Sequence, residues 1–446
     1  MPWVVRDVVN DINKAVGRRW RSLDPLLPAP GQLPQGCGAP LVVTGTDGRA
    51  VGLGACVHQP VPPGSLNQTW GAATRFILTP RLGGQDTAAS LGALLSQWRD
   101  HLAGVAAAHE DDTAAFISWP TRDITGVRAL LRHGLQPLTV VAARTRPGTA
   151  RSGTARSGNP PGTARSGNPP GTAWSGIARS DSAPGGNGRP PAPPGVTIRR
   201  AGPLDVDTVF ALEMGVIEFD AHFGGPVKRE ATAELLYAEV RASLERPEPA
   251  WTWLAERGRR PVALLVTQPP PDARWISGMT RRSPAAYLQT MFVIPEERGG
   301  GVGTALVRCA HRELDAWGID VTLLHHSQVN PLSGPFWYRM GYRPLWTTWE
   351  ARPALSLRGT PRSPAVTSQG GNLLLVARNS YGKLTVFLKV AEVPDVIGAQ
   401  NWERASVTGS ACRGSGPRAR PRRRSRAGVP KAGSWAKAED TLSVRS

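Results

Sequence analysis

A segment rich in Gly, Pro, Ser and Thr divides this chain of 446 residues and limits what each side of it can fold into. Between residues 145 and 195, the run Pro-Gly-Thr-Ala-Arg-Ser-Gly-Asn-Pro at 161–169 starts again at Pro170. Large apolar side chains are nearly absent there, so the segment cannot bury enough surface to offset its ordering entropy. Solenoid repeats are longer and carry apolar core positions. We therefore expect a disordered repeat linker at 147–195 between two domains.

Each side of the linker shows its own succession of strand and helix patterns. Before it, two apolar runs flank Thr46-Asp47-Gly48, a hairpin signal, and strands then alternate with helices up to Arg144. The same order returns between Val196 and Glu350. This order predicts the α+β (α/β mixed) fold class, with one domain at 1–146 and a second at 196–355.

Residues 356–446 lack most of this patterning. We expect a basic, mostly disordered tail with a possible β-hairpin at 373–390. Ten basic residues between Arg413 and Arg445 stand against two acidic ones, a net of +8 within the formal charge of +19. Since the tail has no recognisable module for reading nucleic acid, its charge alone does not indicate nucleic-acid binding.

Two further features concern the cellular compartment. Asp7 and Asp11 interrupt the apolar pattern at the start, which argues against a signal or transit peptide, and no run approaches the ~20 apolar residues of a membrane span. The cysteines have neither zinc-site nor disulfide-framework spacing; they are Cys37, Cys56, Cys309 and Cys412. We expect a cytoplasmic protein with no membrane partner.

The two halves align when residues 122–137 are shifted by 207 positions. The shift superimposes Asp123 on Asn330, Leu131 on Tyr338, Gly134 on Gly341 and Pro137 on Pro344. These matches predict a tandem duplication.

The strongest functional signal is the glycine-rich stretch at 293–304. An apolar run, Tyr287 to Val293, predicts a buried strand before it, and helical spacing follows it. Glycines at a strand-to-helix turn let a ligand approach the backbone, and the free N–H groups of the helix start favour an anion. A Walker A loop would need a lysine before Thr304, and Leu306 breaks a GxGxxG pattern.

Two motifs resemble those of the GNAT acetyltransferase superfamily. Arg298-x-x-Gly301-x-Gly303, after a strand ending Val293-x-Pro295, resembles its acyl-CoA-binding motif. Asn330 followed by Phe336 to Tyr342 is similar to its asparagine and tyrosine segment. The resemblance covers about 196–352 and, more faintly, 1–146. It implies a GNAT-like central, largely antiparallel splayed sheet flanked by helices, present twice.

The resemblance also implies acetyl-CoA as co-substrate and no metal. Main-chain N–H groups of the turn would hold the pyrophosphate with Arg298 nearby, and the strand before the turn would pair with the pantetheine amides. Asn330 would contact the cofactor, hold the gap open or cap the next helix. The implied cofactor-binding residues are Met291, Phe292, Val293, Arg298, Gly299, Gly300, Gly301, Val302, Gly303, Thr304 and Asn330.

The resemblance implies that Tyr338 is the general acid that protonates the departing thiolate. The base stays open, because many relatives carry a glutamate on the strand before the turn where this chain has Gln289 and Thr290. One alternative is that water accepts the proton in place of a side chain. The side-chain candidates for base or acceptor site are Glu218, Asp220 and His222, or one of His325 and His326, since neighbours on a strand face opposite sides.

The corresponding turn of the first half, at 79–87, has lost the arginine and the later glycines. Asp86 would place a negative charge near the pyrophosphate, and Leu131 stands at the Tyr338 position. We therefore expect a degenerate, non-catalytic first domain.

Together these features predict an acetyl-CoA-dependent N-acetyltransferase that moves an acetyl group to a primary amine by direct attack in a ternary complex. The acceptor would be a small-molecule or protein amine, and the protein a monomer or homodimer. Two alternatives remain: a nucleic-acid-binding protein that uses the Arg-rich tail, and a CoA-binding regulatory protein without turnover.

Overall fold

The computed structural model describes residues 2–34, 40–148, 192–246 and 251–359, together with two strands beyond them. The first half contains α1 (Pro2–Leu23), β1 (Leu41–Thr44), β2 (Ala50–Pro60), β3 (Thr74–Leu82), α2 (Thr87–Ala103), β4 (Thr113–Pro120), α3 (Ile124–Arg132) and β5 (Gln136–Thr145). The second half contains β6 (Val196–Arg200), α4 (Val206–Ala221), α5 (Thr232–Leu244), β7 (Thr252–Arg257), β8 (Arg260–Gln268), α6 (Arg274–Ser277), β9 (Ala285–Val293), α7 (Val302–Ala316), β10 (Val321–Ser327), α8 (Ser333–Arg339) and β11 (Arg343–Ala351).

Two predicted segments lie largely outside the described residues. They are the repeat linker and the tail from residue 360. Within the tail, β12 (Leu374–Arg378) pairs antiparallel with β13 (Leu384–Leu388), inside the span 373–390 where a hairpin is predicted. Among the described residues, no helix combines the length and the apolar character that crossing a lipid bilayer requires.

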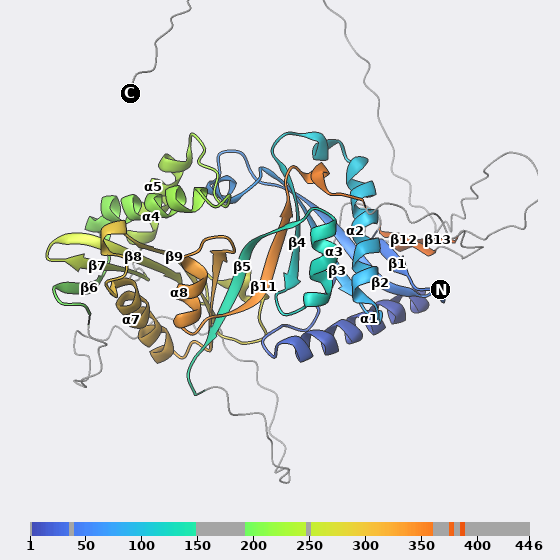
Figure 1. Cartoon of the computed structure of the whole chain (residues 1–446), viewed down its shortest axis with the longest axis horizontal. Helices are drawn as coiled ribbons and strands as arrows, with labels where there is room; N and C mark the ends of the chain where they lie inside the picture. The colour runs from blue at the N-terminus through green and yellow to red at the C-terminus, as the bar shows by residue number, and fades with distance from the viewer. Residues whose placement is uncertain are drawn as a thin grey trace, which may run out of the picture. The chain divides into compact units, whose positions relative to one another are not determined.

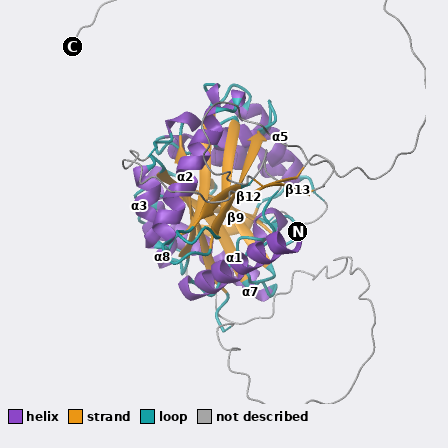
Figure 2. Ribbon diagram, turned by 90° about the vertical axis from the view of Figure 1, so that its right-hand side faces the viewer, coloured by secondary structure: helices purple, strands orange, loops and turns teal. Residues whose placement is uncertain are grey.

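In the described part of the chain, β1 to β11 form one mixed sheet in the order β1-β2-β3-β4-β11-β5-β10-β9-β8-β7-β6 (Figure 1). Helices lie on both faces of it (Figure 2). The predicted α+β class is therefore confirmed, but the two expected sheets are one. The reason is an exchange of last strands: β11 lies between β4 and β5, and β5 lies between β11 and β10. The exchange leaves neither half with an exposed strand edge at the centre.

The exchanged strands pair symmetrically. β5 and β11 run antiparallel, with Gln136 opposite Glu350 and Ala143 opposite Arg343. A shift of 207 residues leads from Gln136 to Arg343 and from Ala143 to Glu350, so each pair contains the counterparts of the residues in the other pair. A fragment limited to 196–355 would lack β5, which pairs with both β10 and β11. Experiments on the second half therefore need the whole chain.

Alternate residues of the second-half strands enter two cores, as the two-residue period of a strand requires. On β7, Leu254 packs with α4 and α5, whereas Trp253 and Ala255 pack with α7. In the first half, Trp98 of α2 belongs to the core on one face, and Ile12 of α1 packs with Leu53 on the other.

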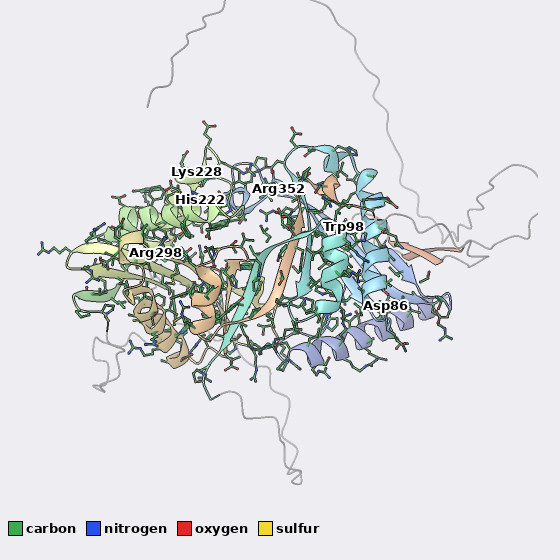
Figure 3. The ribbon with its side chains drawn as sticks, viewed as in Figure 1. Asp86, Trp98, His222, Lys228, Arg298 and Arg352 are labelled. Atoms are coloured by element: carbon green, nitrogen blue, oxygen red, sulfur yellow. The ribbon has the colours of Figure 1, made fainter. Side chains whose placement is uncertain are left out.

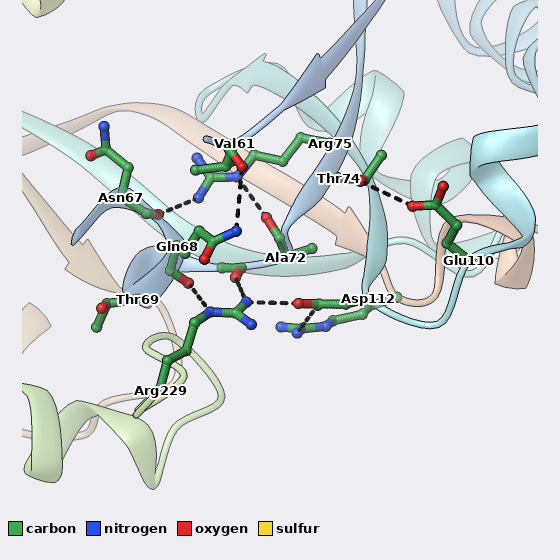
Figure 4. Close-up of polar contacts among 12 residues, drawn as sticks. Val61, Asn67, Gln68, Thr69, Ala72, Thr74, Arg75, Glu110, Asp112 and Arg229 are labelled. Carbon is green, nitrogen blue, oxygen red and sulfur yellow. Dashed lines mark hydrogen bonds and ion pairs between the residues drawn. The ribbon is translucent and has the colours of Figure 1, made fainter. Parts of the chain in front are cut away.

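The loop after α4 is tied to the first half through Arg229 (Figure 4). Its Nε donates to the Gln68 carbonyl at 2.8 Å, and its Nη2 donates to the Gly71 carbonyl at 3.1 Å and to Asp112 Oδ2 at 2.7 Å. The N–H of Val227 also donates to the first half, to the Thr69 carbonyl at 2.7 Å. The first half therefore anchors the segment that follows the end of α4.

Candidate active site

β9 and β10 separate halfway along their length. Their parallel pairing ends at Leu288 opposite Leu324. Beyond that point β9 continues to Val293, bonded to β8, while β10 from His325 onward pairs with β5. The edge of β9 from Gln289 to Val293 therefore has no strand partner on its β10 side among the described residues. A cavity of about 490 Å³ occupies this gap.

The glycine turn forms one rim of the cavity, and its glycines have different roles. Gly301 has a positive φ of 84° just before α7, a conformation that strains other residues. A Cβ on Gly303 would lie 2.7 Å from Met291 Cε, so this glycine lets α7 pack closely on β9. The first N–H groups of α7 have no intrahelical acceptor and can bind an anion.

Most of the predicted cofactor residues line this cavity, and Gly300 does not. The lining residues from that set are Met291, Phe292, Val293, Arg298, Gly299, Gly301, Val302, Gly303, Thr304 and Asn330.

Arg298 is held at the rim (labelled in Figure 3). Its Nε donates to the Val293 carbonyl at 3.0 Å, and its guanidinium lies 4.5 Å from the Phe219 ring centroid. The neighbouring Glu297 is bound by Arg257 through two hydrogen bonds of 2.7 Å. Among the described residues no carboxylate pairs with Arg298, so its remaining donors are available to an anion.

Asp220 lines the cavity from the last turn of α4. Asn330 Nδ2 donates to Asp220 Oδ1 at 3.1 Å, while Asn330 Oδ1 accepts from the N–H of Leu332 at 3.0 Å at the start of α8. Burial raises the pKa of Asp220 above its ordinary value, and the hydrogen bond from Asn330 opposes this rise. Gly215 allows the approach of α4, because a Cβ there would lie 2.8 Å from the Phe292 ring. A carboxylate of raised basicity can accept a proton at this point.

The other two predicted base candidates on this segment lie outside the cavity lining. Glu218 forms an ion pair of 3.1 Å with Lys228, and more than half of each side chain is exposed. His222 is exposed, and its Nδ1 is bonded to the Glu218 carbonyl at 2.9 Å. Figure 3 labels His222 and Lys228. Of the three candidates, the structure brings only Asp220 to the cavity.

His325 and His326 both line the cavity, although their alternation on β10 predicts that at most one reaches it. The separation of the strands opens the gap to both faces of β10. His325 Nδ1 is 3.1 Å from the Tyr287 hydroxyl, and burial lowers the pKa of His325 to about 4. His326 also has a pKa lowered by burial, and its Nε2 is buried without a hydrogen-bond partner. Both rings are therefore neutral near pH 7.

Tyr338 lies outside the cavity lining and is 43% exposed. Its ring is edge-on to His326 at 5.8 Å between centroids. Trp337, one residue earlier and 6% exposed, takes the inward position, because successive helical residues point about 100° apart. The acid role of Tyr338 remains a prediction from the resemblance.

Sequence reasoning did not identify Ser327, which is 8% exposed and lines the cavity. Its Oγ is buried without a partner. The available signal was its place at the end of β10, because ligands gather at the carboxyl ends of parallel strands. No group of three or more His, Cys, Asp or Glu side chains arranged to hold a metal ion occurs in the described ranges.

Residues 218–342 match the family model described as Acetyltransferase (GNAT) family. This match spans Asp220, the glycine turn and Asn330, and it confirms the resemblance inferred from the two motifs. No curated protein matches the chain.

Among solved structures, the chain is similar to a GCN5-related N-acetyltransferase from Sphaerobacter thermophilus, with 14% identity, a TM-score of 0.40, and coverage of 72% of this chain and 84% of that one. It is similar to a tandem GNAT protein from the clavulanic acid biosynthesis pathway, with 14% identity, a TM-score of 0.35, and coverage of 78% and 96%. It is also similar to the PaiA N-acetyltransferase from Thermoplasma acidophilum in complex with coenzyme A, with 15% identity, a TM-score of 0.26, and coverage of 34% and 97%.

Proposed function

Because residues 218–342 match the GNAT acetyltransferase family, we propose that this protein is an acetyl-CoA-dependent N-acetyltransferase acting on a primary amine. The observation that carries the proposal is the edge of β9 that no described strand pairs with, which borders the same cavity as the start of α7. That geometry supplies main-chain partners for an extended ligand and donors for its anionic end.

In this proposal the pyrophosphate binds to main-chain N–H groups of residues 299–304, with Arg298 adding charge. The pantetheine amides pair with main-chain groups of Gln289 to Val293, as an added strand would. Acetyl-CoA supplies the activated thioester, and the walls of the cavity restrict water around it. Acetyl transfer follows direct attack in a ternary complex.

We assign Asp220 as the general base that accepts a proton from the attacking amine. The amine nitrogen forms the bond to the acetyl carbon, the bond from that carbon to sulfur breaks, and the nitrogen loses one proton to Asp220. Gln289 cannot serve as a base, since an amide does not titrate, and its Oε1 accepts from Gln268 at 2.9 Å. The departing thiolate takes its proton from Tyr338, as the resemblance implies, or from solvent.

Isothermal titration of the full chain with acetyl-CoA tests the proposal. We expect one binding site per chain and release of free thiol when a suitable primary amine is added. Arg298→Gln should weaken binding at least tenfold, whereas Arg259→Gln, an exposed arginine on the turn between β7 and β8, should not. Failure of the wild-type chain to bind acetyl-CoA would refute the proposed function.

A further inference from the structure

The first half contains a second gap of the same construction, between β3 and β4. Their parallel pairing ends at Leu78 opposite Ile117, although β3 continues to Leu82 and β4 to Pro120. A cavity of about 280 Å³ lies at these strand ends, and α1 and β11 also contribute to its walls. The degenerate half has therefore kept a cavity at its strand gap, and second-half residues complete the walls.

The chain itself fills the place where a cofactor pyrophosphate would lie in this half. Gly83 is packed under α1, because a Cβ there would lie 3.2 Å from the Cα of Ile12. The carboxylate of Asp86 (labelled in Figure 3) accepts the N–H of Ala89 at 2.9 Å and so caps α2 with its own negative charge. Both features disfavour a second CoA, yet the inner cavity stays open.

Arg81 lines this cavity as a buried cation without an acidic partner. It is the third residue after the last strand pair, as Met291 is in the second half. It is 8% exposed, its Nε has no hydrogen-bond partner, and its Nη1 donates to the adjacent Pro80 carbonyl at 3.0 Å. Arg19, the other basic lining residue, is paired with Asp123. The charge of Arg81 therefore has no acidic partner among the described residues, and an unpaired charge is costly in a buried place.

Burial lowers the pKa of Arg81 to about 10, so its side chain still carries its charge near pH 7. Its planar fork of N–H donors matches a carboxylate better than it matches a spherical anion.

The rest of the lining is mainly aromatic and apolar, and it also includes the polar side chains of Arg19, Thr79 and Ser118. Trp20 and Trp346 meet edge-to-face at 5.1 Å between centroids, and the Arg81 guanidinium lies 5.3 Å from the Trp20 ring. The Trp346 Nε1 donates to the Met279 carbonyl at 2.8 Å, so this indole N–H is already satisfied. A mostly apolar cavity with a small number of polar groups is the usual form of a small-molecule site.

We propose that this cavity binds a small organic carboxylate, which pairs with Arg81 while its apolar or aromatic body packs against Trp20 and Trp346. The cavity is many times larger than the ~30 Å³ share of one water molecule, so an anion of benzoate size fits. Inorganic phosphate would satisfy the charge but leave the apolar walls uncovered.

Titration of the full chain with benzoate and 3-phenylpropanoate, followed by tryptophan fluorescence and calorimetry, tests this proposal. We expect saturable binding at one site per chain. Benzamide, the neutral analogue of benzoate, and inorganic phosphate should bind at least tenfold more weakly. Arg81→Met should weaken carboxylate binding at least tenfold without lowering the thermal midpoint of the free protein, because it removes an unpaired buried charge.

The two sites can be separated by matched variants. Arg81→Met should retain acetyl-CoA binding, and Arg298→Gln should retain carboxylate binding, so failure at one site is distinguishable from failure at the other. If Arg81→Met does not fold, Arg81→Lys keeps the charge without the fork and should also bind carboxylate more weakly. Unchanged affinity in the variant that folds would overturn the proposal. The proposal would also be overturned if the wild-type chain bound no carboxylate, if benzamide bound as tightly as benzoate, or if phosphate bound more tightly than benzoate. The same holds if the wild-type chain bound a second acetyl-CoA that Arg81→Met did not bind.

Discussion

Replacement of Asp220 by asparagine removes the proposed base and preserves its shape. The new amide oxygen can still accept the hydrogen bond that Asn330 Nδ2 donates at 3.1 Å in the wild type. Since burial raises the pKa of Asp220, the fold disfavours its charge, and a neutral amide should not reduce stability. A positioned general base contributes about 10²- to 10⁴-fold to a rate. We therefore expect kcat to fall at least ~100-fold, equivalent to ~2.7 kcal/mol of barrier, with acetyl-CoA affinity nearly unchanged.

Thiol release measured across pH separates a base from a structural residue. Asp220 works in its deprotonated form, so the wild-type kcat/KM should rise with pH through an apparent pKa above the ordinary aspartate value of about 3.9. This limb should be absent in Asp220→Asn. Glu218→Gln is the matched control, because Glu218 is exposed and paired with Lys228, and it should retain turnover within twofold. If Asp220→Asn kept turnover within threefold and the same pH profile, the assignment would be wrong.

Gly301→Val should weaken acetyl-CoA binding about tenfold in calorimetry, because a φ of 84° costs a residue with a side chain roughly 1–2 kcal/mol. The control Gly300→Ala should bind acetyl-CoA normally, because its Cβ would meet only the Glu297 carbonyl, at an ordinary 3.6 Å. Equal affinities of the two variants would contradict the roles assigned to these glycines. Burial in α4 raises the pKa of Glu213 to about 8 from an ordinary 4.5. The free energy of unfolding, measured by urea denaturation, should therefore fall by up to ~5 kcal/mol as pH rises between these values. In Glu213→Gln this fall with pH should be absent. Tyr338→Phe decides between the two proton donors proposed for the thiolate. A kcat at least tenfold lower with unchanged KM would assign the proton to Tyr338, whereas a kcat retained within about threefold, which the position of the ring outside the cavity lining favours, would assign it to solvent.

The sequence was sufficient where local chemistry decides the structure. The turn at 293–304 was predictable because positive φ at Gly301 and the start of α7 are local properties of a glycine-rich strand-to-helix junction. Asn330 was predictable for the same reason, since its side chain binds the N–H groups two and three residues later.

Long-range packing decides the features that the sequence did not reveal. Whether β5 pairs within its own half or with β10 depends on strands nearly two hundred residues away in the chain, so the shared sheet was not predicted. The inward position of Trp337, in place of Tyr338, depends on how α8 packs against the sheet. The burial of Arg81 depends on α1, which comes from another part of the chain. A local pattern cannot report which helix covers which strand end.

Hydrogen exchange at individual peptides, with and without acetyl-CoA, tests the central claim that the second-half gap alone holds the cofactor. We predict slower exchange of main-chain amides in residues 289–304 when acetyl-CoA is added to the full chain, with no change at 79–87. Unchanged exchange at 289–304, or protection at 79–87, would contradict the account.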